Sequence, residues 1–246
     1  MSQISQAALS ALRSAHPTIA IDGPSGSGKS TVARGLAALL HGDYVDTGAT
    51  YRAMTWWLLG CAVDVTSQDV IAEHAHQPMI ELGIDPSSPA VWVDAQDVTL
   101  AIRTEEVSNA VSQVAAVPAV RRRLVALQRA YAETAEAQHR AVVMEGRDIA
   151  SVVLPGADVK IWLTADIDAR AARRAAQDSV LLGSAAQVND VARDLANRDE
   201  ADSMRETTPV RVNPESAIVD ATHLNVEQTI NAVLRIALEQ MGLPHE

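Results

Sequence analysis

The chain has 246 residues, of which 48% are hydrophobic and 21% are charged, and its formal net charge at pH 7 is −11. This length and composition suit one soluble α/β domain with inserted segments. The negative charge argues against bulk nucleic acid or an anionic membrane as a partner, since either would need a basic face, whereas a phosphorylated small molecule needs only a local cluster of the 20 lysines and arginines.

The N-terminal residues 1–16 mix serine, glutamine and alanine with isolated apolar residues. They lack the charged start and compact apolar block of a signal peptide, and no apolar run reaches the roughly 20 residues of a transmembrane helix. We therefore expect a flexible extension there, with a frayed helix as the alternative. A single cysteine, Cys61, excludes an internal disulfide and favours a reducing compartment, so the expected location is the cytoplasm. The apolar stretch around Cys61 predicts that its side chain is buried.

Short apolar runs alternate with helical patterns from Thr18 onward, which is typical of a parallel sheet flanked by helices. The predicted strands cover residues 18–22, 42–46, 141–144, 159–163 and 217–220. The predicted helices of this ladder cover residues 30–40, 51–59 and 226–240. The pattern thus predicts a five-stranded sheet with helices on its faces.

A region of different character lies in the middle of the chain. Residues 90–100 read as a hairpin around a three-residue turn, and residues 104–137 read as a helix interrupted at Pro118. Because a hairpin does not belong inside a ladder of alternating strands and helices, we interpret residues 82–103 as an insertion into the domain formed by residues 17–246.

The first strand leads into a complete G-x-x-x-x-G-K-[ST] motif. The predicted ATP-binding residues are Gly23, Pro24, Ser25, Gly26, Ser27, Gly28, Lys29, Ser30 and Thr31. Glycines let backbone amides approach phosphate oxygens, and the start of the following helix adds positive potential. Lys29 is expected to reach the β- and γ-phosphates, and the Ser30 hydroxyl is expected to bind Mg²⁺. The strand–loop–helix setting disfavours a fortuitous glycine–serine turn.

The class of P-loop protein depends on the rest of the chain. A GTPase normally carries an N-K-x-D segment, which is missing here, and a motor ATPase carries a strand ending in Asp-Glu. The strand 141–144 is followed instead by Glu145, Gly146, Arg147 and Asp148. Both of these classes are therefore disfavoured.

Arginines recur at the ends of the predicted elements, where open α/β sheets bind their ligands. They are Arg52, Arg121, Arg147, Arg170, Arg173, Arg174, Arg198 and Arg205. As a set they predict a binding site for several phosphates. We interpret Arg122, Arg123 and Arg193 as solvated surface residues.

Several further segments, in order along nearly the whole chain, resemble the bacterial cytidylate kinase family. They are residues 46–52, 102–107, 112–121, 145–149, 159–165 and 198–205. The resemblance implies a P-loop nucleoside-monophosphate kinase fold: a core of residues 17–81, 104–164 and 206–246, a β-containing monophosphate-binding insertion at 82–103, and a helical lid at 165–205. Ala150 and Ser151 depart from the Gly and Thr that are usual in the family.

The resemblance also implies an activity, namely ATP- and Mg²⁺-dependent phosphorylation of CMP and dCMP to CDP and dCDP by a monomer. Ser25, Thr47, Tyr51 and Arg52 match positions of the monophosphate pocket. Ser112, Arg121 and Asp148 match positions that read cytosine. Arg198, Asp202 and Arg205 match positions that hold ribose and phosphate. The implied catalytic residues are Lys29, Arg147, Arg170, Arg173 and Arg174.

The chemistry of the base supports that reading of Asp148. Cytosine offers an amino donor at N4 to a carboxylate and acceptors at N3 and O2 to an arginine, whereas uracil would turn a carbonyl toward the carboxylate. Asp148 could instead be a structural partner of Arg147 or a helix cap. Two other functions also stay open: a kinase for UMP or a non-nucleotide acceptor, and a nucleotide-binding switch without phosphotransfer.

Overall fold

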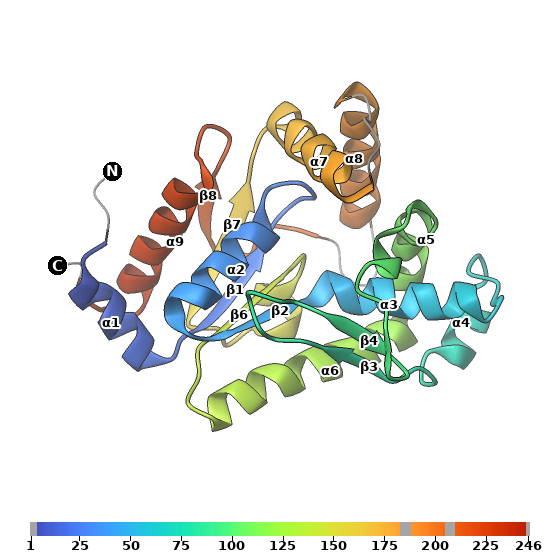
Figure 1. Ribbon diagram of the computed structural model, residues 1–246, viewed down its shortest axis with the longest axis horizontal. Helices are drawn as coiled ribbons and strands as arrows, with labels where there is room; N and C mark the ends of the chain where they lie inside the picture. The colour runs from blue at the N-terminus through green and yellow to red at the C-terminus, as the bar shows by residue number, and fades with distance from the viewer. Residues whose placement is uncertain (1–3, 183–187, 205–209, 245–246) are drawn as a thin grey trace.

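A computed structural model describes residues 4–182, 188–204 and 210–244, with the side chains of 177–182, 198, 201 and 202 outside that description. Figure 1 shows a central sheet between two groups of helices, with a smaller sheet and a pair of helices beside it. Both chain ends lie at the same side of the molecule. No helix in the described part of the chain has the length and apolar character needed to cross a membrane.

The central sheet has five parallel strands in the order β2-β6-β1-β7-β8, which confirms the expected core. The strands are β1 (Thr18–Asp22), β2 (Asp43–Asp46), β6 (Val142–Gly146), β7 (Val159–Thr164) and β8 (Ala217–Asp220). Pairing of β1 with β6 sets Asp22 opposite Gly146. The loops that follow these two strands therefore leave the sheet side by side.

Helices cover both faces of the sheet, because successive side chains of a buried strand point to opposite sides. Ile19 and Ile21 of β1 enter the apolar layer under one face, and Ala20 enters the layer under the other. The first face carries α1 (Gln6–Ala15), α2 (Lys29–Leu40) and α9 (Val226–Gln240). The second carries α3 (Thr47–Gly60), α4 (Gln68–His74), α5 (Glu105–Ala116) and α6 (Pro118–Ala137). The expected break at Pro118 is confirmed.

The N-terminal segment is more ordered than expected. Ser5 caps α1 by accepting from the Ala8 amide, and Ala8 and Leu12 are completely buried in the apolar layer shared with α2 and α9. The expected flexible extension is therefore wrong for the residues of α1. The helix owes its order to tertiary packing of one apolar face.

Truncation of Leu12 tests this packing. We expect Leu12→Ala to lower the free energy of unfolding by about 2–5 kcal/mol, as for other fully buried leucines, without changing the affinity for ATP. Leu39→Ala, on the exposed side of the neighbouring α2, is the matched control and should cost far less. Urea titration measures both, and equal effects would contradict the packing of α1.

The inserted region forms a small antiparallel sheet of β3 (Ile80–Leu82), β4 (Val91–Val93) and β5 (Gln96–Asp97), followed by a 3₁₀ turn, η1 (Ala101–Arg103). The expected hairpin is present, but its turn has two residues, Asp94 and Ala95, both with positive φ (50° and 65°). Such a turn matches the twist of the strands it joins. The strand β3 was not predicted and begins before the expected boundary at residue 82.

Two helices occupy the range expected for the lid, α7 (Ile167–Leu182) and α8 (Val188–Ser203), and they pack through Ala171, Val191 and Leu195. A one-turn π-helix, η2 (Ile149–Val153), follows β6 and Asp148.

Cys61 is exposed, contrary to expectation, because α3 ends at Gly60 and the cysteine is its C-cap.

Candidate active site

The P-loop closes on itself between β1 and α2. Gly23 has φ 150°, and a Cβ there would lie 2.0 Å from the backbone oxygen of Leu163, so only glycine fits. The nearly buried Lys29 crosses the loop and donates to the Pro24 carbonyl at 2.8 Å. The chain thus forms the backbone cradle and the lysine position that its sequence motif predicts.

A cleft of about 590 Å³ opens beside this loop. Its walls come from the P-loop, the ends of β2 and β6, the lid helix α7 and the start of α9. The predicted residues that line it are Ser25, Gly26, Ser27, Gly28, Lys29, Ser30, Thr31, Arg52, Arg147, Arg173 and Arg174. Arg103 also lines it, and the sequence analysis had given that arginine no role.

Positive charge is concentrated in this cleft, although the protein as a whole is acidic. Burial and, after it, the charge of Arg174 lower the pKa of Arg52 to about 10; Asp46 opposes this shift, and Arg103 and Arg147 contribute smaller lowering effects. Arg52 is held in place by the Ile102 carbonyl and the Ser108 hydroxyl at 3.0 and 2.9 Å. Four cations that repel one another at neutral pH fit a site for phosphate anions.

Oxygen atoms gather where the start of α2 meets the end of β6. Ser30 donates to the Glu145 carboxylate at 2.5 Å, and the Tyr44 hydroxyl donates to the same oxygen at 3.0 Å. Burial raises the pKa of Glu145, and the Asp46 carboxylate raises it further. Ser30, Glu145 and Asp46 all line the cleft and offer the hard ligands that Mg²⁺ prefers. No role of Glu145 was predicted from the sequence, because only the fold brings β6 next to α2.

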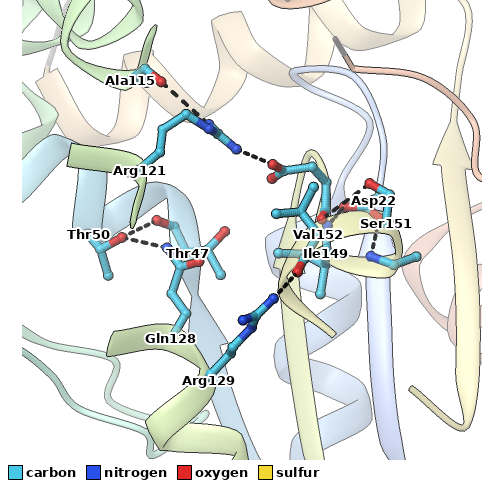
Figure 2. A network of polar contacts seen from close by, with 12 residues as sticks. Asp22, Thr47, Thr50, Ala115, Arg121, Gln128, Arg129, Ile149, Ser151 and Val152 are labelled. Atoms are coloured by element: carbon cyan, nitrogen blue, oxygen red, sulfur yellow. Dashed lines mark hydrogen bonds and ion pairs between the residues drawn. The ribbon is translucent and has the colours of Figure 1, made fainter. Parts of the chain in front are cut away.

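Figure 2 shows a second polar cluster, whose residues Arg121 and Asp148 do not line the cleft. Arg121 of α6 forms an ion pair with Asp148, and 8% and 12% of their side-chain surfaces are exposed. The Arg121 guanidinium also lies over the Tyr51 ring, 5.7 Å from its centroid. Three of the predicted acceptor-site residues thus come together from α3, α6 and the loop after β6.

The helix-cap alternative for Asp148 is wrong. Its carboxylate makes no cap bond to the turn that it precedes, and the neighbouring Arg147 donates to the Gly23 carbonyl at 2.6 Å. Ser112 lies half-buried on α5. The hydroxyl of Thr47 is buried and donates to the Glu145 carbonyl at 2.8 Å, so it braces the start of α3.

The three lid arginines of α7 point to different partners. Arg174 faces Arg52 in the cleft, and Arg173 donates to the carbonyls of Ser27 and Ala221 at 3.3 and 2.6 Å. Arg170 does not line the cleft; it donates to the Ser25 carbonyl at 3.0 Å and pairs with Asp199 at 2.5 Å. Asp199 of α8 also accepts from the Ser25 amide at 3.2 Å. Arg170 therefore fastens the lid to the P-loop, which differs from its expected contact with phosphate.

Removing Asp199 tests this fastening. We expect Asp199→Ala to lower kcat for transfer about tenfold and to raise ATP hydrolysis relative to transfer, because a loosened lid admits water. Asp190→Ala is the control on the same helix, since Asp190 pairs at 3.4 Å with Arg193 on the surface. Assays of ADP release with and without acceptor measure both. An unchanged ratio in Asp199→Ala would contradict the role of this contact.

The remaining arginines divide between the surface and the frame of the fold. Arg122 and Arg193 are exposed, as expected. The expectation for Arg123 is wrong, because it donates to the carbonyls of Ala75 and Pro78 and anchors the segment after α4. The side chains of Arg198 and Asp202, and the whole of Arg205, lie outside the described residues.

The carboxylate of Asp22, at the edge of the site, has a raised pKa. Asp22 is 3% exposed, and burial raises its pKa to about 6 despite hydrogen bonds from the amides of Ile149 and Ala150. Between the unfolded value of 3.8 and 6, the folded protein holds a proton that the unfolded chain has released. The stability that Asp22 contributes is therefore lost as the pH rises through about 6.

This linkage can be measured against an uncharged reference. The free energy of unfolding of the wild type, minus that of Asp22→Asn, is expected to be about 1 kcal/mol larger at pH 5 than at pH 7. Urea titrations of both proteins at the two pH values give the difference. A difference that grows toward pH 7 would contradict the raised pKa.

Comparison with known proteins agrees with this geometry. The family model described as cytidylate kinase matches residues 19–239. A cytidylate kinase of Streptomyces avermitilis is 46% identical over 222 residues, which cover 90% of this chain and 93% of the relative. Cytidylate kinases of Rhodococcus jostii (44% over 224 residues; 91% and 96%) and Geobacillus kaustophilus (43% over 225 residues; 92% and 98%) are similarly close. With a P-loop, an arginine-lined cleft and matches that span nearly its whole length, the chain belongs to the cytidylate kinase family.

Proposed function

We propose that the chain transfers the γ-phosphoryl group of ATP to the 5′-phosphate of CMP and dCMP, giving ADP with CDP or dCDP. The observation that carries this proposal is one cleft that joins the P-loop to a cluster of four arginines, with the Arg121–Asp148 pair behind it. The acceptor phosphate is an anion at neutral pH and needs no general base. Catalysis then depends on positioning and on neutralisation of charge.

The donor occupies the P-loop side of the cleft. Backbone amides of the loop bind the phosphates, Lys29 neutralises the charge on the β- and γ-phosphates, and the wall formed by Ala221, Leu224 and Val226 accepts the donor base. Ser30 would hold Mg²⁺ together with Glu145 and Asp46. When bound, Mg²⁺ would supply further neutralisation of phosphate charge. Arg170 keeps the lid on the loop and so excludes water.

The acceptor occupies the arginine side. Arg52, Arg103, Arg147 and Arg174 bind its phosphate and the group in transfer. Arg121 engages one oxygen of Asp148, Oδ2, so Oδ1 can accept the N4 amino group of cytosine while Arg121 donates to the ring acceptors. The ring of Tyr51 packs against the guanidinium of Arg121 and helps to hold it in position. We keep Ser112 with this base site, and Arg198, Asp202 and Arg205 with the ribose and phosphate, as part of the proposal.

Two other candidates are separated by a coupled assay of ADP release with CMP, dCMP, UMP and AMP. The proposal predicts turnover with the two cytosine nucleotides and little with UMP or AMP. Equal turnover with UMP would contradict base recognition by Asp148, and no acceptor-dependent turnover would favour a nucleotide-binding switch. We further propose that the protein acts as a cytoplasmic monomer, without nucleic acid or membrane as a partner, in line with its net charge and single cysteine.

A further inference from the structure

Asp148 occupies the N-cap position of η2, where the side chain of an aspartate usually caps the helix. Such a side chain commonly accepts hydrogen bonds from the first amides of its own helix. Those amides would otherwise be buried without a partner, at a cost of about 1–3 kcal/mol each. Yet the carboxylate of Asp148 makes no such bond and turns to Arg121 instead. Another group must therefore accept hydrogen bonds from the backbone amides in the first turn of η2.

Asp22, from the end of β1, does so (Figure 2). One of its carboxylate oxygens accepts from the amide of Ile149 at 2.7 Å, and the other accepts from the amide of Ala150 at 2.8 Å. The register of β1 against β6 sets Asp22 opposite Gly146, which brings it to the loop that carries Asp148. Both capping bonds therefore come from a residue 127 and 128 positions earlier in the chain.

We infer that Asp22 is a positioning residue for recognition of the acceptor base: it caps η2 in place of Asp148 and so leaves the Asp148 carboxylate free for Arg121 and the base. The inference rests on the proposed function. Asp22 also precedes Gly23 directly, so the strand that supports the ATP cradle sets the orientation of the base-reading carboxylate as well.

Contacts at the rest of η2 are consistent with this division of roles. Arg129 donates to the carbonyls of Val152 and Val153 at 2.6 and 2.9 Å, and Asn213 donates to the carbonyl of Ala150 at 2.9 Å. These bonds hold carbonyl groups, whereas the two amides nearest Asp148 depend on Asp22. The charge of Asp148 adds to burial in raising the pKa of Asp22, as expected for two carboxylates that face each other across this turn.

The test compares acceptor selectivity, the ratio of kcat/KM for CMP to kcat/KM for UMP. In Asp22→Asn the new side chain keeps one acceptor and turns an amino group toward the other backbone amide, so Asp148 is expected to turn back and cap that amide. Selectivity should fall about tenfold, with the KM for ATP little changed. Asp43→Asn is the matched control: Asp43 is a buried carboxylate paired with Arg140 at the opposite end of the sheet, and this variant should keep wild-type selectivity.

A double-mutant cycle separates positioning from a general loss of structure. If Asp22 acts through Asp148, then Asp22→Asn should lower selectivity no further in an Asp148→Asn background. Wild-type selectivity in Asp22→Asn, or a further loss in the double variant, would overturn the inference. Should Asp22→Asn not fold, Asp22→Glu, which displaces the carboxylate by one methylene, must show the same loss or the inference is wrong.

Failure of the proposed function can be distinguished from failure of this inference alone. A wild-type enzyme that uses UMP as well as CMP, or an Asp148→Asn variant that keeps full selectivity, would overturn base recognition by Asp148 and this inference together. Loss of selectivity in Asp148→Asn with full selectivity in Asp22→Asn would overturn the inference alone.

Discussion

Replacing Lys29 by methionine is expected to lower kcat by on the order of 10³-fold or more, the magnitude seen when an electrostatic contact to the reacting group is removed. Lys29 is nearly buried, lines the cleft, and donates from its ammonium group to the Pro24 carbonyl across the P-loop. Methionine fills a similar volume without the charge. The loss should therefore appear in the chemical step, because no other lysine lies near the cleft.

The chain offers a close control for this change. Its one other lysine is Lys160 of β7, which is also nearly buried. Lys160 pairs with Glu215 and does not line the cleft. Lys160→Met is expected to cost stability and to leave kcat within a few-fold of wild type. Steady-state assays with saturating ATP and CMP measure both variants. Comparable losses of kcat would mean that Lys29 acts through folding and not through the phosphates.

Replacing Asp148 by asparagine is expected to lower the selectivity for CMP over UMP by on the order of 10²-fold, through two changes in hydrogen bonding. The N4 amino group of cytosine would lose a charged acceptor, and the new amide could donate to the carbonyl that uracil carries at the same position. Binding of ATP should persist, since Asp148 does not line the P-loop cleft.

The matched control is Asp158→Asn, a carboxylate on the loop before β7 that accepts from the Thr18 amide at 2.8 Å and lies outside the cleft. It should leave selectivity unchanged. Values of kcat/KM for CMP and UMP in the three proteins decide the matter. A variant of Asp148 that discriminates as the wild type does would remove this residue from base recognition.

Much of the fold could be predicted from local patterns. Strand β8 and helix α9 have the predicted bounds, because an apolar strand and a helical apolar face each leave a periodic signal in consecutive residues. For helix α1 the sequence left only a frayed helix as an alternative to a flexible extension, because its apolar face is short and is ordered by the cover of α2 and α9. Strand β3, three residues long, leaves too little pattern to recognise.

In the candidate site, too, residues that are contiguous in the sequence were predicted, whereas contacts between distant segments were not. The P-loop is contiguous in sequence, and its motif predicted the cradle and the lysine. The resemblance to known kinases placed Arg121 and Asp148 in one base-reading group without predicting a contact between them, and the structure shows that they form an ion pair. Their role in reading the base stays a prediction. Glu145 and Asp22 were missed, because their partners Ser30, Ile149 and Ala150 are over a hundred positions away. The catalytic role of Arg170 stays a prediction. Its bond to the Ser25 carbonyl was not predicted, because a sequence shows which helix carries an arginine but not which neighbour accepts its hydrogen bonds.

The most direct test of the central claim is a competition experiment. The protein is mixed with Mg·ATP and equal amounts of CMP and UMP, and the diphosphates formed are followed by ³¹P NMR. Our account predicts that CDP and ADP appear together in equal amounts while UDP stays a small fraction. Formation of ADP without CDP, or of UDP as fast as CDP, would contradict it.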